Sequence, residues 1–179
     1  MPGLTRRALA AGFAGLTLSR WVPAQAADYR WEAVPPEPDA PIVFTDARGR
    51  TQDLSSYRGQ PLLLNLWATW CGPCVVELPA LDRLQRDLGK SRLRVLALSL
   101  DRGGMRDVND AHRRLRLRRL ERLVDASGAA ARVLRVAGLP STYAIDAGGR
   151  FLARRRGAVA WDSAEERRQL EKLFSHRRG

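Results

Sequence analysis

Cysteine and histidine are scarce in this 179-residue sequence, which has two of each. The cysteines, Cys71 and Cys74, stand two residues apart, whereas His112 and His176 are distant from them. A structural zinc site takes four Cys or His ligands, so we expect no metal site and no other cofactor. A purely structural disulfide is disfavoured too, because closing so short a loop constrains the unfolded chain very little. The cysteine pair is therefore expected to be the working part of the protein.

Lysine is also nearly missing, since Lys90 and Lys172 are the only two, and the formal net charge of +12 rests on arginine. Such a high ratio of arginine to lysine is typical of genome composition rather than of a binding surface. The arginine-rich segments 113–119 and 154–156 have no interleaved aromatic residues and no nucleic-acid motif. We expect no nucleic-acid partner and only a weak bias towards acidic partners or anionic surfaces. His112, among these arginines, is predicted to be a surface residue.

The apolar segment nearest the start, residues 8–18, is too short to span a bilayer. It follows Arg6-Arg7 and precedes Ala24-Gln25-Ala26, which is the order of a charged region, an apolar region and a cleavage site. We therefore predict that residues 1–26 are an export signal of the Sec or twin-arginine type and that the protein is periplasmic. No cysteine lies near the cleavage site, which excludes a lipid anchor there. An uncleaved membrane anchor is the alternative.

The rest of the sequence divides into an extended linker, residues 27–41, rich in proline and charge, and one α/β domain, residues 42–179. Apolar runs and turn residues predict strands at 42–44, 62–67, 93–100, 120–124, 143–145 and 151–153. Helical spacing of apolar residues predicts helices from the cysteine pair to Leu88 and over 105–115, 129–136 and 162–174. The strand–helix–strand order of residues 62–100 implies parallel pairing through a right-handed crossover.

The cysteine pair lies where the apolar strand Leu62–Trp67 turns through Gly72-Pro73 into a helix. The N–H groups and partial positive charge of a helix N-terminus stabilise a thiolate, and Cys-x-x-Cys pairs have lowered thiol pKa values. We expect Cys71 to be exposed and to attack as the nucleophile. We expect Cys74, one helical turn inside, to be sheltered and to resolve the mixed disulfide.

Four segments resemble those of the TlpA/ResA-like branch of the thioredoxin family, the exported thiol-disulfide oxidoreductases. They are residues 65–74 (NLWATWCGPC), residues 77–79 (ELP), residues 138–142 (GLPST) and the hairpin of residues 145–149. The resemblance covers residue 44 to the end of the chain. It implies a thioredoxin-like α/β fold, in which helices flank a central mixed sheet. An N-terminal hairpin and a strand–helix insertion in mid-chain would be added to that core.

The resemblance also implies roles for residues around the cysteines. Pro140 would be a cis-proline facing the disulfide, and Leu139 would offer backbone groups to an extended partner segment. An ordinary trans turn proline is the alternative. Trp70, Gly72 and Pro73 are expected to contact the substrate.

One acidic residue is expected to take part in the chemistry. Cytoplasmic thioredoxins carry a buried aspartate six residues before the first cysteine, but this sequence has Asn65 there, which cannot take up a proton. Glu77 matches the acidic residue that TlpA/ResA-like proteins carry near the active site, and it lies one helical turn from Cys74. We expect Glu77 to assist deprotonation of Cys74, directly or through water. A solvated glutamate in a first helical turn is the alternative.

The dipeptide between the cysteines bears on the direction of the reaction. Gly-Pro is the thioredoxin dipeptide, and thioredoxin's potential of about −270 mV is far more reducing than the roughly −120 mV of DsbA. We therefore predict a reductase of exported protein disulfides. By resemblance, its clients would be apocytochrome c haem-site cysteines or copper-site assembly proteins, and its electron donor a membrane thiol carrier of the DsbD/CcdA kind. The alternatives are a dithiol oxidase or isomerase, a thiol peroxidase, or a non-enzymatic copper-binding or partner-docking module.

Overall fold

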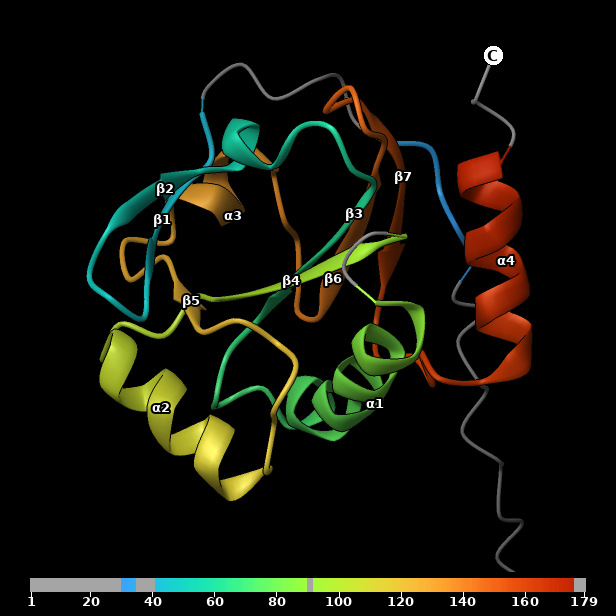
Figure 1. Ribbon diagram of the computed structural model, residues 1–179. Helices are drawn as coiled ribbons and strands as arrows, with labels where there is room; N and C mark the ends of the chain where they lie inside the picture. The colour runs from blue at the N-terminus through green and yellow to red at the C-terminus, as the bar shows by residue number, and fades with distance from the viewer. Residues whose placement is uncertain (1–29, 35–40, 90–91, 176–179) are drawn as a thin grey trace, which may run out of the picture.

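A computed structural model describes residues 30–34, 41–89 and 92–175. They build one seven-stranded mixed sheet of order β2-β1-β5-β4-β3-β6-β7, flanked by helices (Figure 1). The strands are β1 (Val43–Asp46), β2 (Thr51–Asp53), β3 (Leu62–Trp67), β4 (Arg94–Ser99), β5 (Leu123–Val124), β6 (Ser141–Ile145) and β7 (Phe151–Arg156). The helices are η1 (Leu54–Tyr57, 3-10), α1 (Gly72–Leu88), α2 (Met105–Arg114), α3 (Ala129–Val133) and α4 (Ala164–Ser175). The predicted central mixed sheet with flanking helices is confirmed.

Strand β3 lies inside the sheet, parallel to β4 and antiparallel to β6. All six of its side chains are buried, which explains why its sequence is a continuous apolar run. Successive side chains point to opposite faces of the sheet, so Leu63 and Trp67 enter one core cluster while Leu62 and Leu64 enter the other. The same alternation puts Asn65 on the face of Leu63 and Trp67, where α1 packs.

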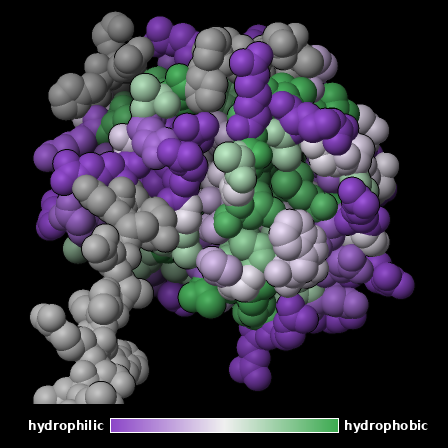
Figure 2. Space-filling view, turned by 180° about the vertical axis from the view of Figure 1, so that it is seen from behind, coloured by the Kyte–Doolittle hydropathy of each residue, from purple (hydrophilic) through white to green (hydrophobic). Residues whose placement is uncertain are grey.

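The two faces of the sheet carry different helices. Helices α1, α2 and α4 contribute to the cluster that holds both cysteines, whereas α3 and η1 contribute to the cluster on the other face. Seen from the side opposite to Figure 1, hydrophobic side chains form a band through the middle of the surface, bordered by hydrophilic ones (Figure 2). The cysteine pair therefore belongs to the α1 side of the core.

Three elements differ from the predicted length by three residues each, the largest differences among the strands and helices. Strand β5 has only two residues, because it pairs with only two residues of β4 and of β1. Helix α3 stops at Val133, and Arg135 then adopts a left-handed φ of 50°. Strand β7 is longer than predicted, since it runs to Arg156 and pairs along the whole of β6.

Part of the predicted linker is ordered against β7. The backbone of Glu32 exchanges two hydrogen bonds with Arg154, at 2.7 and 2.9 Å. The Glu32 carboxylate accepts from the side chains of Arg154 and Arg156, and the Arg155 side chain is paired with Glu166. The run of three arginines is thus accounted for by carboxylates of the same chain.

The predicted export signal, residues 1–26, lies outside the described residues, so it and the domain boundaries stay predictions. No helix in the described part of the chain is both long and apolar enough to cross a membrane.

The surface position predicted for His112 is wrong. Only 7% of this residue is exposed, and Val108, Ala111 and His112 form the buried face of α2. Burial, and then the charge of Arg122, lowers the pKa of His112 to about 4. The i, i+3, i+4 spacing of these three residues is that of a core-facing stripe, so the sequence did contain the information that places His112 inside.

Candidate active site

Cys71 and Cys74 form a disulfide at the start of α1, with their Cα atoms 5.3 Å apart. Cys71 is the N-cap residue of the helix, and its Sγ accepts a hydrogen bond from the backbone N–H of Cys74 at 3.3 Å. Pro73 occupies the first turn, where its missing N–H leaves no hydrogen bond unmade. The sulfur of Cys71 thus accepts a hydrogen bond at the positive end of the helix, which favours its thiolate once the disulfide is reduced.

The two sulfurs differ less in exposure than predicted. Cys74 is fully buried, as expected, but Cys71 is only 7% exposed. The expectation of an exposed Cys71 is therefore wrong for the disulfide form. The physical reason is that the disulfide bond to Cys74 holds the Cys71 sulfur in the first turn of the helix. There the sulfur accepts a hydrogen bond from the backbone N–H of Cys74.

A pocket of about 510 Å³ opens beside the disulfide. The predicted Trp70, Gly72, Pro73 and Leu139 all line it, and Trp70 is 72% exposed. The rest of the lining comes from the end of β4 and from α3 and the loop after it: Leu100, Ala131, Val136, Ala137 and Gly138. Gly138 belongs to the GLPST segment singled out in the sequence, but no sequence pattern marked the other four, because only the folded sheet brings them to the cysteines.

The peptide bond between Leu139 and Pro140 is cis, as the resemblance implied. Pro140 itself is buried, and its carbonyl accepts a hydrogen bond from Gly157 at 2.9 Å. Leu139 lines the pocket beside the disulfide, whereas Pro140 does not.

Glu77 is not a solvated glutamate, since only 2% of it is exposed. Its Oε1 accepts from Asn65 Nδ2 at 2.7 Å. Its Oε2 accepts from the backbone N–H of Val159 at 3.0 Å and from the indole Nε1 of Trp161 at 3.1 Å. All three donors are neutral, and no cation among the described residues pairs with the carboxylate.

Burial in this environment raises the pKa of Glu77 to about 7, against an ordinary value of 4.5. The three hydrogen bonds act in the opposite sense, because they stabilise the ionised form. Desolvation is the larger effect, and it leaves a carboxyl group that exchanges its proton near neutral pH. A buried carboxyl of this kind can accept and return a proton.

Several partners of Glu77 were not predicted. Asn65 Nδ2 also donates to Thr142 Oγ1 at 3.0 Å, and these two residues are direct neighbours in the β3–β6 register. Val159 and Trp161 follow β7, more than eighty positions after Glu77 in the sequence. Nothing in the local sequence indicates that their N–H groups converge on this carboxylate.

A second buried carboxylate supports the loop before the cysteines. Asp101 accepts hydrogen bonds from the backbone N–H and the hydroxyl of Thr69, the latter at 2.7 Å. Ser99 Oγ donates to the same carboxylate at 2.7 Å. The end of β4 is thereby tied to the loop after β3, which sets the position of Trp70 and Cys71.

The comparisons with known proteins agree with this arrangement. Residues 36–152, more than half of the chain, match the AhpC/TSA family. The chain belongs to the AhpC/TSA family. The thiol-disulfide oxidoreductase ResA of Geobacillus kaustophilus is 30% identical over 132 residues, which are 74% of each chain. The thiol:disulfide interchange protein DsbE of Vibrio cholerae is 35% identical over 116 residues, 62% of this chain and 58% of the relative.

Solved structures show the same relationship. The exposed lipoprotein thioredoxin Etrx1 of Streptococcus pneumoniae superposes with a TM-score of 0.61 at 27% identity, over 75% of this chain and 98% of that one. The protein is therefore a TlpA/ResA-like member of the thioredoxin family with a thioredoxin-like fold. With the Cys71–Cys74 pair in place, it is a thiol-disulfide oxidoreductase.

Proposed function

We propose that this oxidoreductase reduces protein disulfides outside the cytoplasm. The observation that carries the direction is the Gly72-Pro73 dipeptide between the cysteines. It is the dipeptide of thioredoxin, whose potential of about −270 mV makes it a reductant, whereas DsbA at about −120 mV is an oxidant.

The cycle begins with the reduced enzyme. The thiolate of Cys71 attacks one sulfur of a client disulfide, the client S–S bond breaks, and the other client sulfur leaves and takes up a proton. Cys74 then loses its proton, and its thiolate attacks Cys71 Sγ, which releases the second client thiol. Two electrons have passed to the client, and the enzyme is left with the Cys71–Cys74 disulfide.

Glu77 accepts the proton of Cys74 in the second step. Both residues are buried and lie one turn apart on α1. A pKa of about 7 suits a general base at neutral pH, and the donors around the carboxylate hold its ionised form in one place. Asn65, Val159 and Trp161 are positioning residues in this scheme, since they act through Glu77.

The client segment lies in the pocket beside the disulfide. The lining of Leu100, Ala131, Val136 and Leu139 is apolar, which favours clients with an apolar side chain next to the reactive cysteine. Trp70, Gly72 and Pro73 contact the segment from the cysteine side, and the backbone of Leu139 pairs with it.

The clients and the donor follow from the family resemblance. Apocytochrome c haem-site cysteines or copper-site assembly proteins receive the electrons, and a membrane thiol carrier of the DsbD/CcdA kind supplies them. Export directed by residues 1–26 brings the enzyme to the periplasm, where these partners meet it.

The redox potential of the full-length protein tests the direction. The protein is equilibrated in dithiothreitol buffers while the fluorescence of Trp67 and Trp70, which precede the cysteine pair in sequence, is followed. A midpoint near −270 mV agrees with a reductase, and a midpoint near −120 mV overturns it in favour of an oxidase or isomerase on the same fold. Cys71→Ser serves as the control, because its fluorescence should not respond to the buffer potential.

A further inference from the structure

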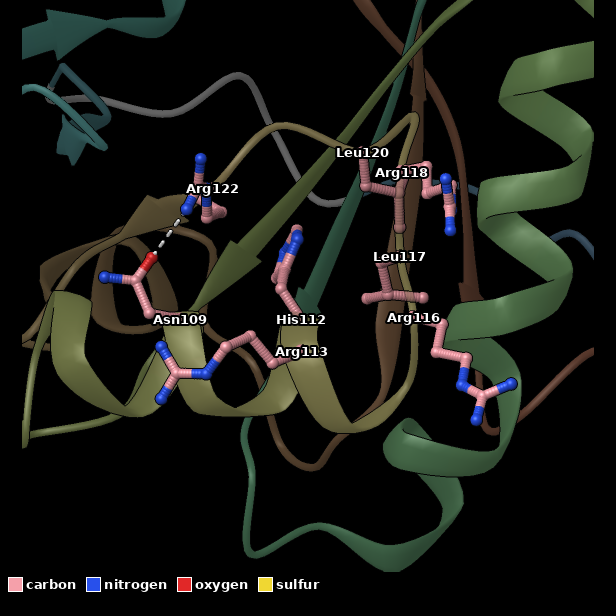
Figure 3. Close-up of a pocket in the computed structure, with 8 residues that line it drawn as sticks. All are labelled: Asn109, His112, Arg113, Arg116, Leu117, Arg118, Leu120 and Arg122. Carbon is pink, nitrogen blue, oxygen red and sulfur yellow. Dashed lines mark hydrogen bonds between the residues drawn. The ribbon is translucent and has the colours of Figure 1, made fainter.

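A second pocket, of about 380 Å³, lies between α2 and the loop that leads into β5. Four of the residues that line it are arginines: Arg113, Arg116, Arg118 and Arg122. Figure 3 shows the imidazole of His112 rising from α2 between Arg122 on one side and Leu117 on the other. The guanidinium groups lie around the pocket rather than meeting at one point (Figure 3).

Most of this positive charge is not neutralised by the described part of the chain. Arg113 pairs with Asp110, but Arg122 donates only to the neutral side chain of Asn109, at 3.1 Å. Within the described residues, the side chains of Arg116 and Arg118 make no ion pair or hydrogen bond. Three guanidinium groups therefore line one small pocket without a carboxylate partner.

His112 supplies an independent indication of a ligand. It is 93% buried, and its Nε2 has no hydrogen-bond partner among the described residues. Folded proteins rarely leave a buried side-chain nitrogen unpaired, because its desolvation is then uncompensated. Since its lowered pKa keeps the imidazole neutral, Nε2 can carry the ring proton and donate it to a bound acceptor.

The wall of the pocket is held rigidly. Asp82 Oδ1 accepts hydrogen bonds from the backbone N–H groups of Arg118, Arg119 and Leu120, at 2.9, 2.7 and 3.0 Å. The N–H of Leu117 donates to the carbonyl of His112 at 3.0 Å, which ties the loop to the end of α2. The charge of Asp82 opposes an anion, but three hydrogen bonds already engage it, and a ligand would have little chain to order.

We propose that this pocket binds a small polyanion with two or more carboxylate or phosphate groups. Arg116, Arg118 and Arg122 hold the anionic groups, and His112 Nε2 donates a hydrogen bond to one of them. The volume equals that of about a dozen water molecules at roughly 30 Å³ each, which is too large for a monatomic anion alone. The spacing of the guanidinium groups around the pocket requires more than one anionic group in the ligand.

Citrate and pyrophosphate serve as probes of this site in the full-length protein. Because the chain has only two histidines, histidine-labelled protein gives two imidazole signals by NMR, and His176 is an internal control. We expect each probe that binds to shift the His112 signal saturably while the His176 signal stays unchanged. Binding by both probes shows a site for either group, and binding by one alone identifies the carboxylate or the phosphate class.

Matched variants assign the binding to these arginines. Arg116→Gln and Arg118→Gln should each weaken the affinity about tenfold or more, the cost of losing a charged hydrogen bond. Arg168→Gln removes the same charge from the exposed surface of α4 and should change the affinity less than twofold.

Four results would overturn the proposal. They are shifts that do not saturate for either probe, equal shifts of both histidines, the same shifts from sodium chloride at matched ionic strength, and equal binding of uncharged triethyl citrate. If Arg168→Gln weakened the affinity as much as Arg116→Gln, binding would depend on the net charge of the protein and not on this pocket. The wild-type titration stands even if a variant fails to fold, which its thermal unfolding would reveal.

Discussion

Glu77 and Glu166 are both buried glutamates, with 2% and 7% of their surface exposed, but their surroundings differ. Glu166 faces the guanidinium of Arg155 in an ion pair, whereas Glu77 accepts only from neutral donors. Trp161 lies between the two sites, since its indole N–H bonds to Glu77 and Arg155 sits over its ring at 5.9 Å. A buried carboxylate that faces a cation is compensated by an opposite charge, whereas Glu77 lacks one and burial raises its pKa to about 7.

The difference separates a structural carboxylate from one suited to chemistry. Glu166 joins α4 to β7, and breaking such a pair leaves a buried charge alone. Glu77 joins α1 to the segment after β7, yet its hydrogen bonds do not offset the desolvation of its charge. Five experiments test the roles assigned to these two glutamates.

The largest effect is expected for Cys71→Ser, which removes the nucleophile on which the role of Glu77 depends. Disulfide reduction should fall at least 10³-fold, to the uncatalysed rate, because serine does not form a thiolate. The measurement is the rate of reduction of a disulfide-bonded test protein. Retained function in a client assay would instead favour a non-enzymatic docking or copper-binding module.

Glu166→Gln should destabilise the fold by about 3–5 kcal/mol, because it leaves the buried Arg155 without its counter-charge. The rate of disulfide exchange per folded molecule should change less than twofold. Urea unfolding monitored by circular dichroism measures the stability. A loss of exchange rate in fully folded protein would contradict the structural role.

Ionisation of Glu77 should make stability fall as pH rises. Between the ordinary pKa of 4.5 and the folded pKa of about 7, the unfolded chain has lost this proton while the folded chain keeps it. The free energy of unfolding therefore falls by about 3 kcal/mol over that interval and does not fall further at higher pH. The difference between wild type and Glu77→Gln in urea unfolding, measured from pH 4 to 8, isolates this contribution. A difference that does not change with pH would contradict a raised pKa.

Glu77→Gln should slow disulfide exchange about 10²-fold near pH 7, the contribution of a general base. The fold should survive, because the Gln oxygen can accept from Val159 and Trp161 while its amide faces Asn65. Asn65 Oδ1, which has no partner among the described residues, becomes an acceptor for that amide when the Asn65 side chain flips. The pH–rate profile should also lose its inflection near 7. An unchanged profile would show that Cys74 is deprotonated without Glu77.

The smallest effect is expected for Trp161→Phe, which removes one of the three donors to Glu77. Since this donor stabilises the ionised carboxylate, its loss should raise the pKa of Glu77 by about one unit. The inflection in the pH–rate profile should move upward by the same amount. A downward shift would show that Trp161 acts through packing and not through its N–H group.

Most of the strands and helices were predictable, because each is set by local periodicity. The apolar run of β3, the leucines of α1 and the turn before β7 all fall where the sequence places them. The ends of β5 and α3 were not predictable, since a strand ends where its neighbours stop pairing with it. The buried position of His112 follows from its helical spacing from Val108 and Ala111, although arginines surround it in the sequence.

The reactive pair was predictable without the fold: Cys71 and Cys74 lie at a helix start with Gly-Pro between them, and Pro140 lies in a segment that resembles the family's GLPST motif. The spacing of the two cysteines and the helical pattern after them reveal the pair, whereas the role of Pro140 was implied by the family resemblance. Only the tertiary structure decided the proton affinity of Glu77, the partner of Arg155 and the pocket around His112. Each of those depends on desolvation and on groups from distant segments, which no local pattern records.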